Sequence, residues 1–261
     1  MAMIMQTVSL CDDVRLSFCE GNTISARTNL HFIPGDERNL AVRAAKKYFE
    51  AIDEPERGLC IHIHKRIPVG AGMGGGSADA AAVLRGLNRA FDNRLSAERL
   101  EELAAEVGSD VAFCVRGGTM LAHGRGELLS ELPDMPKCIF VICKPQFSIS
   151  TPELFRKLDQ VSLRRHPDTA GLISALEQGN LRELCCRMYN VFEDVNDRRM
   201  RTVAAIKSVL IDKGALGAVM TGTGSAVFGV FSDKTEAEGA REELKREHGF
   251  CCLAECVGRL M

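Results

Sequence analysis

The sequence predicts an α+β protein of two domains, residues 1–134 and 135–261, and three observations support this prediction. Residues 4–33 alternate apolar and polar side chains, as half-buried strands do, and amphipathic helices follow them. A glycine-rich run lies where a strand meets a helix. A turn bracketed by prolines at 133–136 separates two apolar blocks, and the second block ends in a helix–strand repeat that suits a ferredoxin-like layer.

Bulk properties exclude several classes of protein. The chain carries 33 basic and 35 acidic residues with no block of like charge, which argues against nucleic acid as the main partner. No apolar run approaches the length of a membrane span, and the N-terminus does not read as a signal peptide. The eleven cysteines include no Cys-x-x-Cys motif and suit reduced thiols in a core, so we predict a cytoplasmic protein.

In the first half, strands are expected at residues 4–10, 14–19 and 23–32, and we predict that they form a β-meander. An amphipathic helix follows at 39–52 and an alternating strand at 59–67. His62 and His64 share one face of that strand. No second pair of ligands is evident, so a half-buried strand face is favoured over a metal site. Further helices are expected to begin near Ser77 and at the capping residue Ser96.

The glycine-rich run at 68–78 is the strongest functional signal in the chain. Five glycines occupy the seven positions 70–76, and a glycine loop that opens a helix exposes unpaired N–H groups that favour a phosphate. A flexible surface turn is the alternative. The P-loop pattern is excluded because no Gly-Lys-Ser/Thr follows. Residues 70–75 satisfy the dinucleotide fingerprint, but a second helix stands where that motif needs a parallel strand. A protein-kinase glycine loop, which sits in a hairpin, fits no better.

The remaining elements follow in order. Asp110 comes after a glycine and before an apolar segment, so it is either a helix cap or a carboxylate placed beside a phosphate. Beyond it we expect strands at 117–126 and 138–143, and a helix capped by Thr151 with Pro152 at its first position. Helices are predicted at 168–178, 181–189, 199–213 and 234–248. A glycine turn at 221–225 leads into a strand at 226–231, and a last strand is predicted at 250–257.

The run at 65–81 resembles the glycine-rich motif of the kinases named for galactose, homoserine, mevalonate and phosphomevalonate. Within that group it is most similar to the kinases of 4-diphosphocytidyl-2-C-methyl-D-erythritol, in non-mevalonate isoprenoid biosynthesis. Three further stretches match in the expected order, at 39–45, 108–113 and 220–228. The resemblance implies a two-domain small-molecule kinase fold, with a ribosomal-protein-S5-domain-2-like N-terminal half and a ferredoxin-like C-terminal half.

The resemblance also implies a reaction, which is phosphorylation of the substrate's 2-hydroxyl by ATP with Mg²⁺. Asp110 would be the catalytic base, Lys65 would help to hold the substrate, and Ser77 would contact phosphate or the metal. Phe155 would stack on the cytosine ring, although it is equally an apolar residue of an amphipathic helix. The other substrate-binding residues are expected to be Thr151, Gly222, Thr223 and Gly224, although residues 221–225 are also compatible with a plain tight turn. The residues expected to bind ATP are Pro68, Val69, Gly70, Ala71, Gly72, Met73, Gly74, Gly75, Gly76, Ser77 and Ala78.

The sequence departs from the resembled family at its N-terminus. The family's Lys-x-Asn strand and Asp-Gly-Tyr-His turn, which supply an active-site cation and part of the base pocket, do not occur in the printed sequence. We therefore expect a fragment or a late-start reading of a longer kinase. Two function classes stay open: a small-molecule kinase, with a sister specificity as the lesser variant, and a nucleotide-binding protein without useful turnover. A homodimer also stays open.

Overall fold

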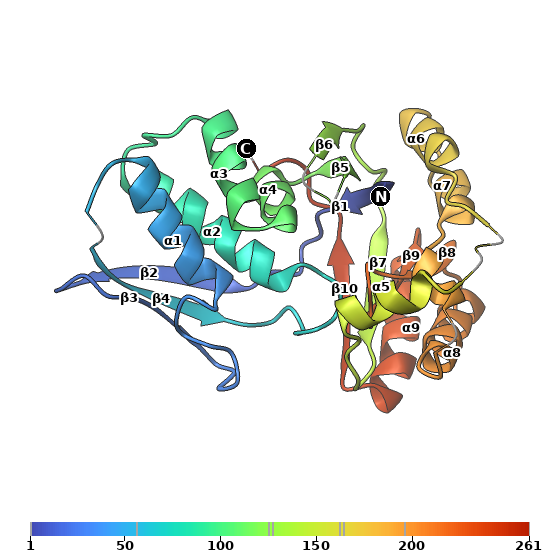
Figure 1. Ribbon diagram of the computed structural model, residues 1–261. Coiled ribbons are helices and arrows are strands. Elements are labelled where there is room, and N and C mark those ends of the chain that lie inside the picture. The colour runs from blue at the N-terminus through green and yellow to red at the C-terminus, as the bar shows by residue number, and fades with distance from the viewer. Residues whose placement is uncertain are drawn as a thin grey trace.

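The computed structural model describes residues 2–55, 57–124, 126, 128–161, 163, 165–195 and 197–260. Figure 1 shows two halves side by side, with the earlier part of the chain in one and the later part in the other. The first half contains two three-stranded sheets, and the second contains one four-stranded sheet. The structure therefore has the α+β architecture predicted from the sequence.

The first half is built on a mixed sheet in which β4 (Gly58–His64) lies between β2 (Asp13–Cys19) and β3 (Ile24–Thr28). β2 runs antiparallel to β4, whereas β3 runs parallel to it. The strand β1 (Ala2–Gln6) belongs to another sheet, with β5 (Thr119–His123) and β6 (Leu128–Glu131). The predicted β-meander is therefore wrong. Alternation identifies the buried face of a strand but not its partner, and β4 separates the two strands that were expected to pair.

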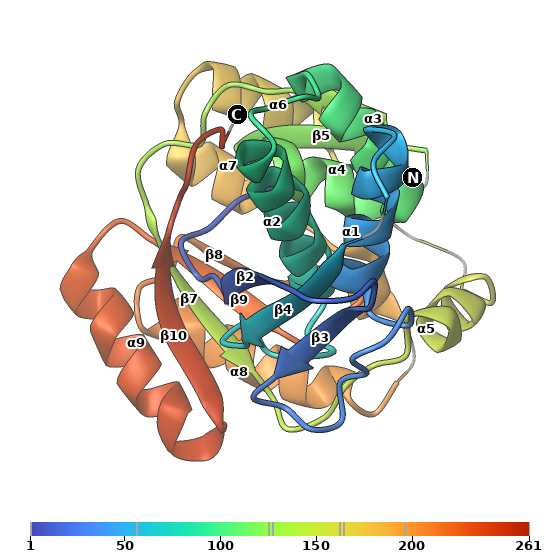
Figure 2. The same ribbon diagram turned by 90° about the vertical axis from the view of Figure 1, so that its left-hand side faces the viewer.

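Four helices lie beside these sheets: α1 (Leu40–Ala51), α2 (Gly75–Ala90), α3 (Ala97–Val107) and α4 (Ser109–Arg116). Figures 1 and 2 show α1 and α2 on one face of the β2–β4–β3 sheet, where Tyr48, Leu59 and Leu84 are buried in the common core. The side chains of Asn39 and Ser96 cap α1 and α3 by accepting backbone N–H bonds. The helix at Ser96 is confirmed. The helix α4 was not predicted, because its eight residues are too few to show a clear period.

The second half has the strand order β10–β7–β9–β8, from β7 (Ile139–Lys144), β8 (Gly217–Met220), β9 (Val227–Phe231) and β10 (Phe250–Glu255). Numbered along the chain this order is 4-1-3-2, with every neighbouring pair antiparallel. The ferredoxin-like layer is therefore confirmed. The helices of this half are α5 (Thr151–Leu158), α6 (Thr169–Glu177), α7 (Leu181–Arg187), the short 3₁₀ helix η1 (Val191–Asp194), α8 (Met200–Asp212) and α9 (Lys234–Glu247).

Two local predictions need correction. Ser150, not Thr151, is the N-cap of α5, because its backbone is extended while Thr151 and Pro152 already lie in the first turn. The strand β8 was missed because its four residues, which include a glycine, resemble a turn.

The end of the chain ties the two halves together. The amide of Val257 donates to the carbonyl of Thr7 over 2.9 Å, and the amide of Leu260 donates to the carbonyl of Arg116 over 2.9 Å. These bonds cross the domain boundary at 134/135, which stays a prediction. Each of the eleven cysteines is a free thiol. Among the residues described, no helix is both long and apolar enough to cross a membrane.

Candidate active site

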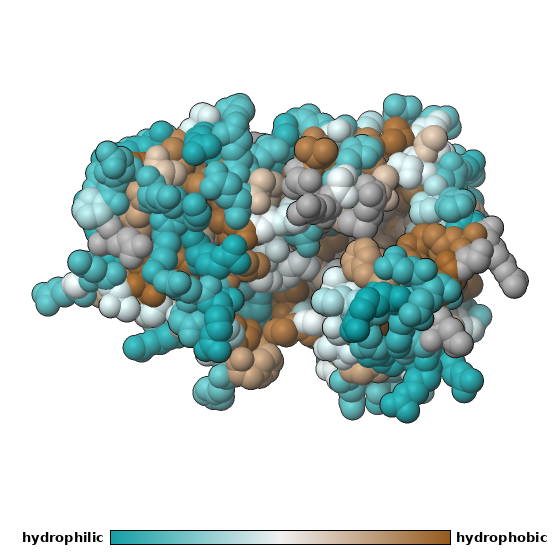
Figure 3. All heavy atoms as spheres, in the orientation of Figure 1, coloured by the Kyte–Doolittle hydropathy of each residue, from teal (hydrophilic) through white to brown (hydrophobic). Residues whose placement is uncertain are grey.

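A cavity of about 410 Å³ opens where β4 ends and α2 begins. The glycine-rich run forms one wall, and the segment before α1 forms the other. Lys65 and Asp79 lie between them. Figure 3 shows the surface indented between the two halves, with apolar residues inside the indentation. The lining residues are Phe32, Ile33, Pro34, Arg38, Asn39, Leu40, Lys65, Ile67, Pro68, Val69, Gly70, Ala71, Gly72, Met73, Gly74, Gly75, Gly76 and Asp79.

Gly70 and Gly72 bring the two halves of the molecule into contact. Both have a positive φ, and a Cβ on Gly72 would collide with the carbonyl oxygen of Thr221 and lie 2.8 Å from the amide nitrogen of Gly224. The hydroxyl of Thr221 donates to the carbonyl of Gly72 over 3.1 Å. The amide of Ala226 donates to the carbonyl of Ala71 over 3.0 Å. The glycine-rich run is therefore positioned by the second half of the chain, so two of its glycines serve a protein contact.

Gly74 is different, because it has open space where a side chain would be. Its φ is +63°, and no atom lies within 4 Å of a Cβ built there. It is the N-cap of α2 and offers no side chain to the unpaired N–H groups of the first turn. Those N–H groups and the positive end of the helix dipole therefore face the cavity free for an anion. Ser77 and Ala78 follow in the first turns of α2, next to the lining residues.

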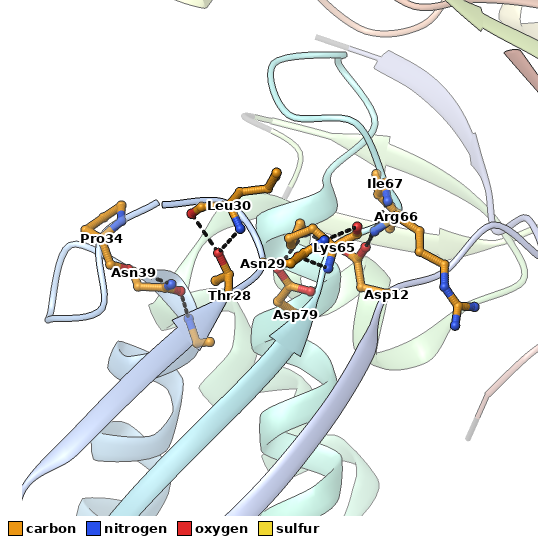
Figure 4. Close-up of polar contacts among 11 residues, drawn as sticks. Asp12, Thr28, Asn29, Leu30, Pro34, Asn39, Lys65, Arg66, Ile67 and Asp79 are labelled. Atoms are coloured by element: carbon orange, nitrogen blue, oxygen red, sulfur yellow. Dashed lines mark hydrogen bonds and ion pairs between the residues drawn. The ribbon is translucent and has the colours of Figure 1, made fainter. Parts of the chain in front are cut away.

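Lys65 is buried between two carboxylates. Its Nζ donates to Oδ2 of Asp12 and, over 2.6 Å, to Oδ2 of Asp79, as Figure 4 shows. The three side chains are only 4%, 2% and 6% exposed. Asp12 also accepts the amide of Ile67 over 2.8 Å, which fixes the chain as it enters the glycine-rich run. The cluster thus holds both ends of the run.

Asp79 carries the strongest electrostatic perturbation near the cavity. Burial raises the pKa of Asp79 to about 7, although the ammonium of Lys65 opposes the shift. Its Oδ1 is buried and has no hydrogen-bond partner among the residues described. One carboxylate oxygen of Asp79, a residue that lines the cavity, is therefore left without a donor in the described part of the chain.

Asp110 lies in the first turn of α4, after the capping residue Gly108, and is half-buried. Burial raises the pKa of its carboxyl. The pKa of Cys114, one turn further along α4, is raised to about 12, chiefly by burial and also by the carboxylates of Asp110 and Asp79. Both acids therefore lie near this thiol, in agreement with the packing of α4 against α2. Asp110 itself does not line the cavity.

Apart from Lys65, the residues predicted to bind the substrate lie around the 221–225 turn and α5. The hydroxyls of Thr151 and Thr223 are 2.9 Å apart. The side-chain amide of Asn190 donates to the carbonyls of Met220 and Gly222 over 2.7 and 2.8 Å. The ring of Phe155 is 38% exposed and packs edge-on against Phe192, with centroids 5.0 Å apart. The structure thus brings Thr151, Thr223 and the glycine-rich run together through one turn.

Sequence reasoning missed Asp12, Asp79 and Asn190. Asp79 could have been found, because a carboxylate on the apolar face of a helix that follows a phosphate motif is unusual. Asp12 and Asn190 gave no signal, because each acts on a segment far away in the chain.

Comparisons with known proteins agree with this geometry. Residues 39–118 match the GHMP kinases N terminal domain and residues 172–249 match the GHMP kinases C terminal domain. The 4-diphosphocytidyl-2-C-methyl-D-erythritol kinase of Syntrophomonas wolfei is 42% identical over 245 residues, which are 94% of this chain and 85% of the relative. The enzyme of the same name from Bacillus subtilis is 41% identical over 251 residues, covering 95% of this chain and 84% of the relative.

Solved structures show the same fold. A crystal structure of 4-(cytidine 5'-diphospho)-2C-methyl-D-erythritol kinase superposes with a TM-score of 0.80 at 28% identity, covering 98% of this chain and 90% of the other. A homoserine kinase from Cytophaga hutchinsonii gives 0.79 at 19% identity, over 98% of this chain and 89% of the other, which shows the fold alone. The matches confirm the family and the enzyme class predicted from the sequence: the chain belongs to the 4-diphosphocytidyl-2-C-methyl-D-erythritol kinases of the GHMP kinase group.

Proposed function

We propose that this protein transfers the γ-phosphoryl group of ATP to the 2-hydroxyl of 4-diphosphocytidyl-2-C-methyl-D-erythritol. The observation that carries the proposal is the glycine-rich run, which opens helix α2, leaves its N–H groups free, and is docked onto the second half of the molecule. Such a run suits the β- and γ-phosphates, and the docking would bring the 221–225 turn beside them. The acceptor is the one named for the related kinases of Syntrophomonas wolfei and Bacillus subtilis.

Residues 68–78 would hold the phosphates of ATP, with the open backbone at Gly74 nearest to them. Mg²⁺ prefers oxygen ligands, and the residues present fit that preference. The Ser77 hydroxyl lies in the first turn of α2, and the unpartnered Oδ1 of Asp79 belongs to a residue that lines the cavity. When bound, Mg²⁺ would neutralise charge on the phosphate oxygens.

The acceptor would be held by Lys65 and by the residues near the 221–225 turn, with Asp110 as the base. Asp110 would take the proton of the 2-hydroxyl while that oxygen bonds to the γ-phosphorus and ADP leaves. Its raised pKa makes it a stronger base than an exposed carboxylate. An ammonium has three donors, and two of those of Lys65 are used, so one is left for the substrate. Phe155 would stack on cytosine, with Thr151, Gly222, Thr223 and Gly224 beside it.

The role of Asp110 is tested by Asp110→Asn, with Asp134→Asn as the matched control. Asp134 is exposed and lies in the segment between the two halves. Removal of a general base is expected to lower kcat by about 10²- to 10⁴-fold, with the melting temperature retained. The control should keep the wild-type rate. Equal rates for wild type and Asp110→Asn would remove Asp110 from the mechanism.

A further inference from the structure

A second concave surface lies on the outer face of the β2–β4–β3 sheet, opposite α1 and α2. It encloses about 650 Å³ and is lined from all three strands. Figures 1 and 2 show the helices on the inner face only, and no described helix or strand covers the outer one. The surface is separate from the proposed ATP cavity, and the two share no lining residue.

Three basic side chains form one row across this face. In the strand register, Arg15 of β2 is directly opposite His62 of β4, and Arg27 of β3 is directly opposite the same histidine. All three are exposed. Neighbouring strands are about 4.8 Å apart, so the row spans about 10 Å from Arg15 to Arg27.

The row has no anionic partner among the residues that the structure describes. Neither arginine makes a side-chain hydrogen bond or an ion pair there. The acid on the same face, Asp13, is paired with Arg66. The two guanidiniums lie on the two strands that flank His62, and they repel each other while no anion lies between them. Arg15 and Arg27 therefore have no carboxylate partner among the described residues, and an anion bound between them would reduce their repulsion.

We propose that this face binds the phosphoryl group of a small phosphorylated molecule. Two guanidinium forks and an imidazole suit a phosphate, because arginine binds its oxygens in a bidentate manner and an imidazole ring donates at least one N–H. The next row adds hydroxyls, since Ser17 and Ser25 lie opposite Cys60 on the two sides of β4. Arg15, Ser17, Arg27 and His62 all line the same concave surface, so one phosphoryl or diphosphoryl group there would be within reach of several of these donors.

The shape of the charge distribution selects a small ligand. The basic row is one residue deep, with serines on one side and the Asp13–His64 pair on the other. A nucleic acid needs a longer basic stripe to follow its backbone. A second copy of the chain stacked on this face about a two-fold axis would bring one basic row against the other. Both are therefore disfavoured by the observed charges.

The test is a calorimetric titration of the full chain with inorganic pyrophosphate in Mg²⁺-free buffer. None of the variants lies in the glycine-rich run, so any binding of pyrophosphate there is the same in every protein and cancels in the comparison. We expect binding to the row to be weakened about tenfold in Arg15→Ala and in Arg27→Ala, because a hydrogen bond to a charged group is lost. Arg246→Ala, at an exposed arginine of α9 without a described partner, should bind like the wild type. Equal affinity in all four proteins, or no binding by the wild type, would overturn the proposal.

A second measurement separates binding from misfolding. Because the two guanidiniums repel each other when no anion is bound, Arg15→Ala and Arg27→Ala should melt no lower than the wild type. Pyrophosphate should raise the melting temperature of the wild type and of Arg246→Ala, and raise it much less in the two row variants. A single-stranded oligonucleotide that binds the row while pyrophosphate does not would assign the face to nucleic acid and contradict the proposal.

Discussion

The two ends of the proposed active site are built in opposite ways. At the phosphate end, the cluster of Lys65, Asp12 and Asp79 is almost fully buried, and the glycine-rich run is clamped against the 221–225 turn. At the end proposed to hold the cytosine base, called the base end here, Phe155 is more than one-third exposed and packs edge-on against Phe192. The phosphate end is thus a rigid structure within the core, whereas the base end is an open surface.

The difference follows from what each end must do. Charge develops during phosphoryl transfer, and donors stabilise it best when they are fixed before the reaction. A flat base that stacks on an aromatic ring needs an accessible face and tolerates small shifts. Substitutions at the phosphate end should therefore cost stability and activity together, whereas those at the base end should change substrate affinity alone.

The largest effect is expected for Lys65→Met. It leaves the carboxylates of Asp12 and Asp79 buried without their cation, which should lower the free energy of unfolding by about 3–5 kcal/mol. Denaturant unfolding measures this loss. Lys46→Met, at a lysine on α1 that pairs with an exposed glutamate, is the control and should cost much less. Comparable losses in the two variants would mean that the buried cluster does not support the glycine-rich run.

Gly72→Ala should separate the two kinds of glycine in the run. Its Cβ meets the backbone of the 221–225 turn at a positive φ, so we expect a loss of about 3 kcal/mol and of most activity. Gly74→Ala has a similar φ but open space, and should cost about 1 kcal/mol. Thermal unfolding compares the two. A Gly74 variant as unstable as the Gly72 variant would contradict the docking contact.

Titration of the buried Asp79 carboxyl should make the stability of the protein depend on pH. Burial raises its folded-state pKa to about 7, above its value in the unfolded chain, so the folded state binds the extra proton. The stabilisation of the folded state by this proton is complete at low pH and is lost as the pH rises through 7. Relative to Asp79→Asn, the wild type should lose up to about 1.4 kcal/mol per pH unit between about pH 4 and 7. Parallel stability curves for the two proteins would show that Asp79 does not titrate in this way.

The smallest effect on the fold is expected for Phe155→Ala. Because stacking on a base contributes about 1–3 kcal/mol, KM for the cytidine substrate should rise about tenfold or more, with little change in melting temperature. Steady-state kinetics with each substrate varied in turn measures this. Phe32→Ala, at an exposed ring beside the proposed ATP cavity, should leave that KM unchanged. An unchanged KM in Phe155→Ala would leave Phe155 as an apolar residue of α5.

Much of this contrast could be predicted from local sequence. The glycine-rich run and the capping residues Asn39 and Ser96 predict where helices begin. These patterns are informative because each lies within a few residues of the helix that it starts. The ferredoxin-like half was predictable for the same reason. Local patterns could not predict contacts between segments that are far apart in the sequence. The insertion of β4 between β2 and β3, and the ion pair between Lys65 and Asp12 fifty-three positions away, depend on the tertiary fold.

The glycines illustrate the limit. Their spacing predicts a bare backbone for a ligand, and Gly74 fits that interpretation. Gly70 and Gly72 instead lie against Ser148 and the 221–225 turn, segments whose approach no local pattern encodes. Glycine is therefore needed for two different physical reasons within residues 70–74: a close contact with the second half of the chain at Gly70 and Gly72, and open space for a ligand at Gly74.

The most direct test of the proposed function is transfer of label from γ-³²P-ATP to 4-diphosphocytidyl-2-C-methyl-D-erythritol by the protein with the printed sequence. We predict labelled product in a 1:1 ratio with ADP, formed only when the acceptor is present. Saturable binding of ATP without any labelled product would contradict the proposed reaction and identify the chain as a nucleotide-binding protein.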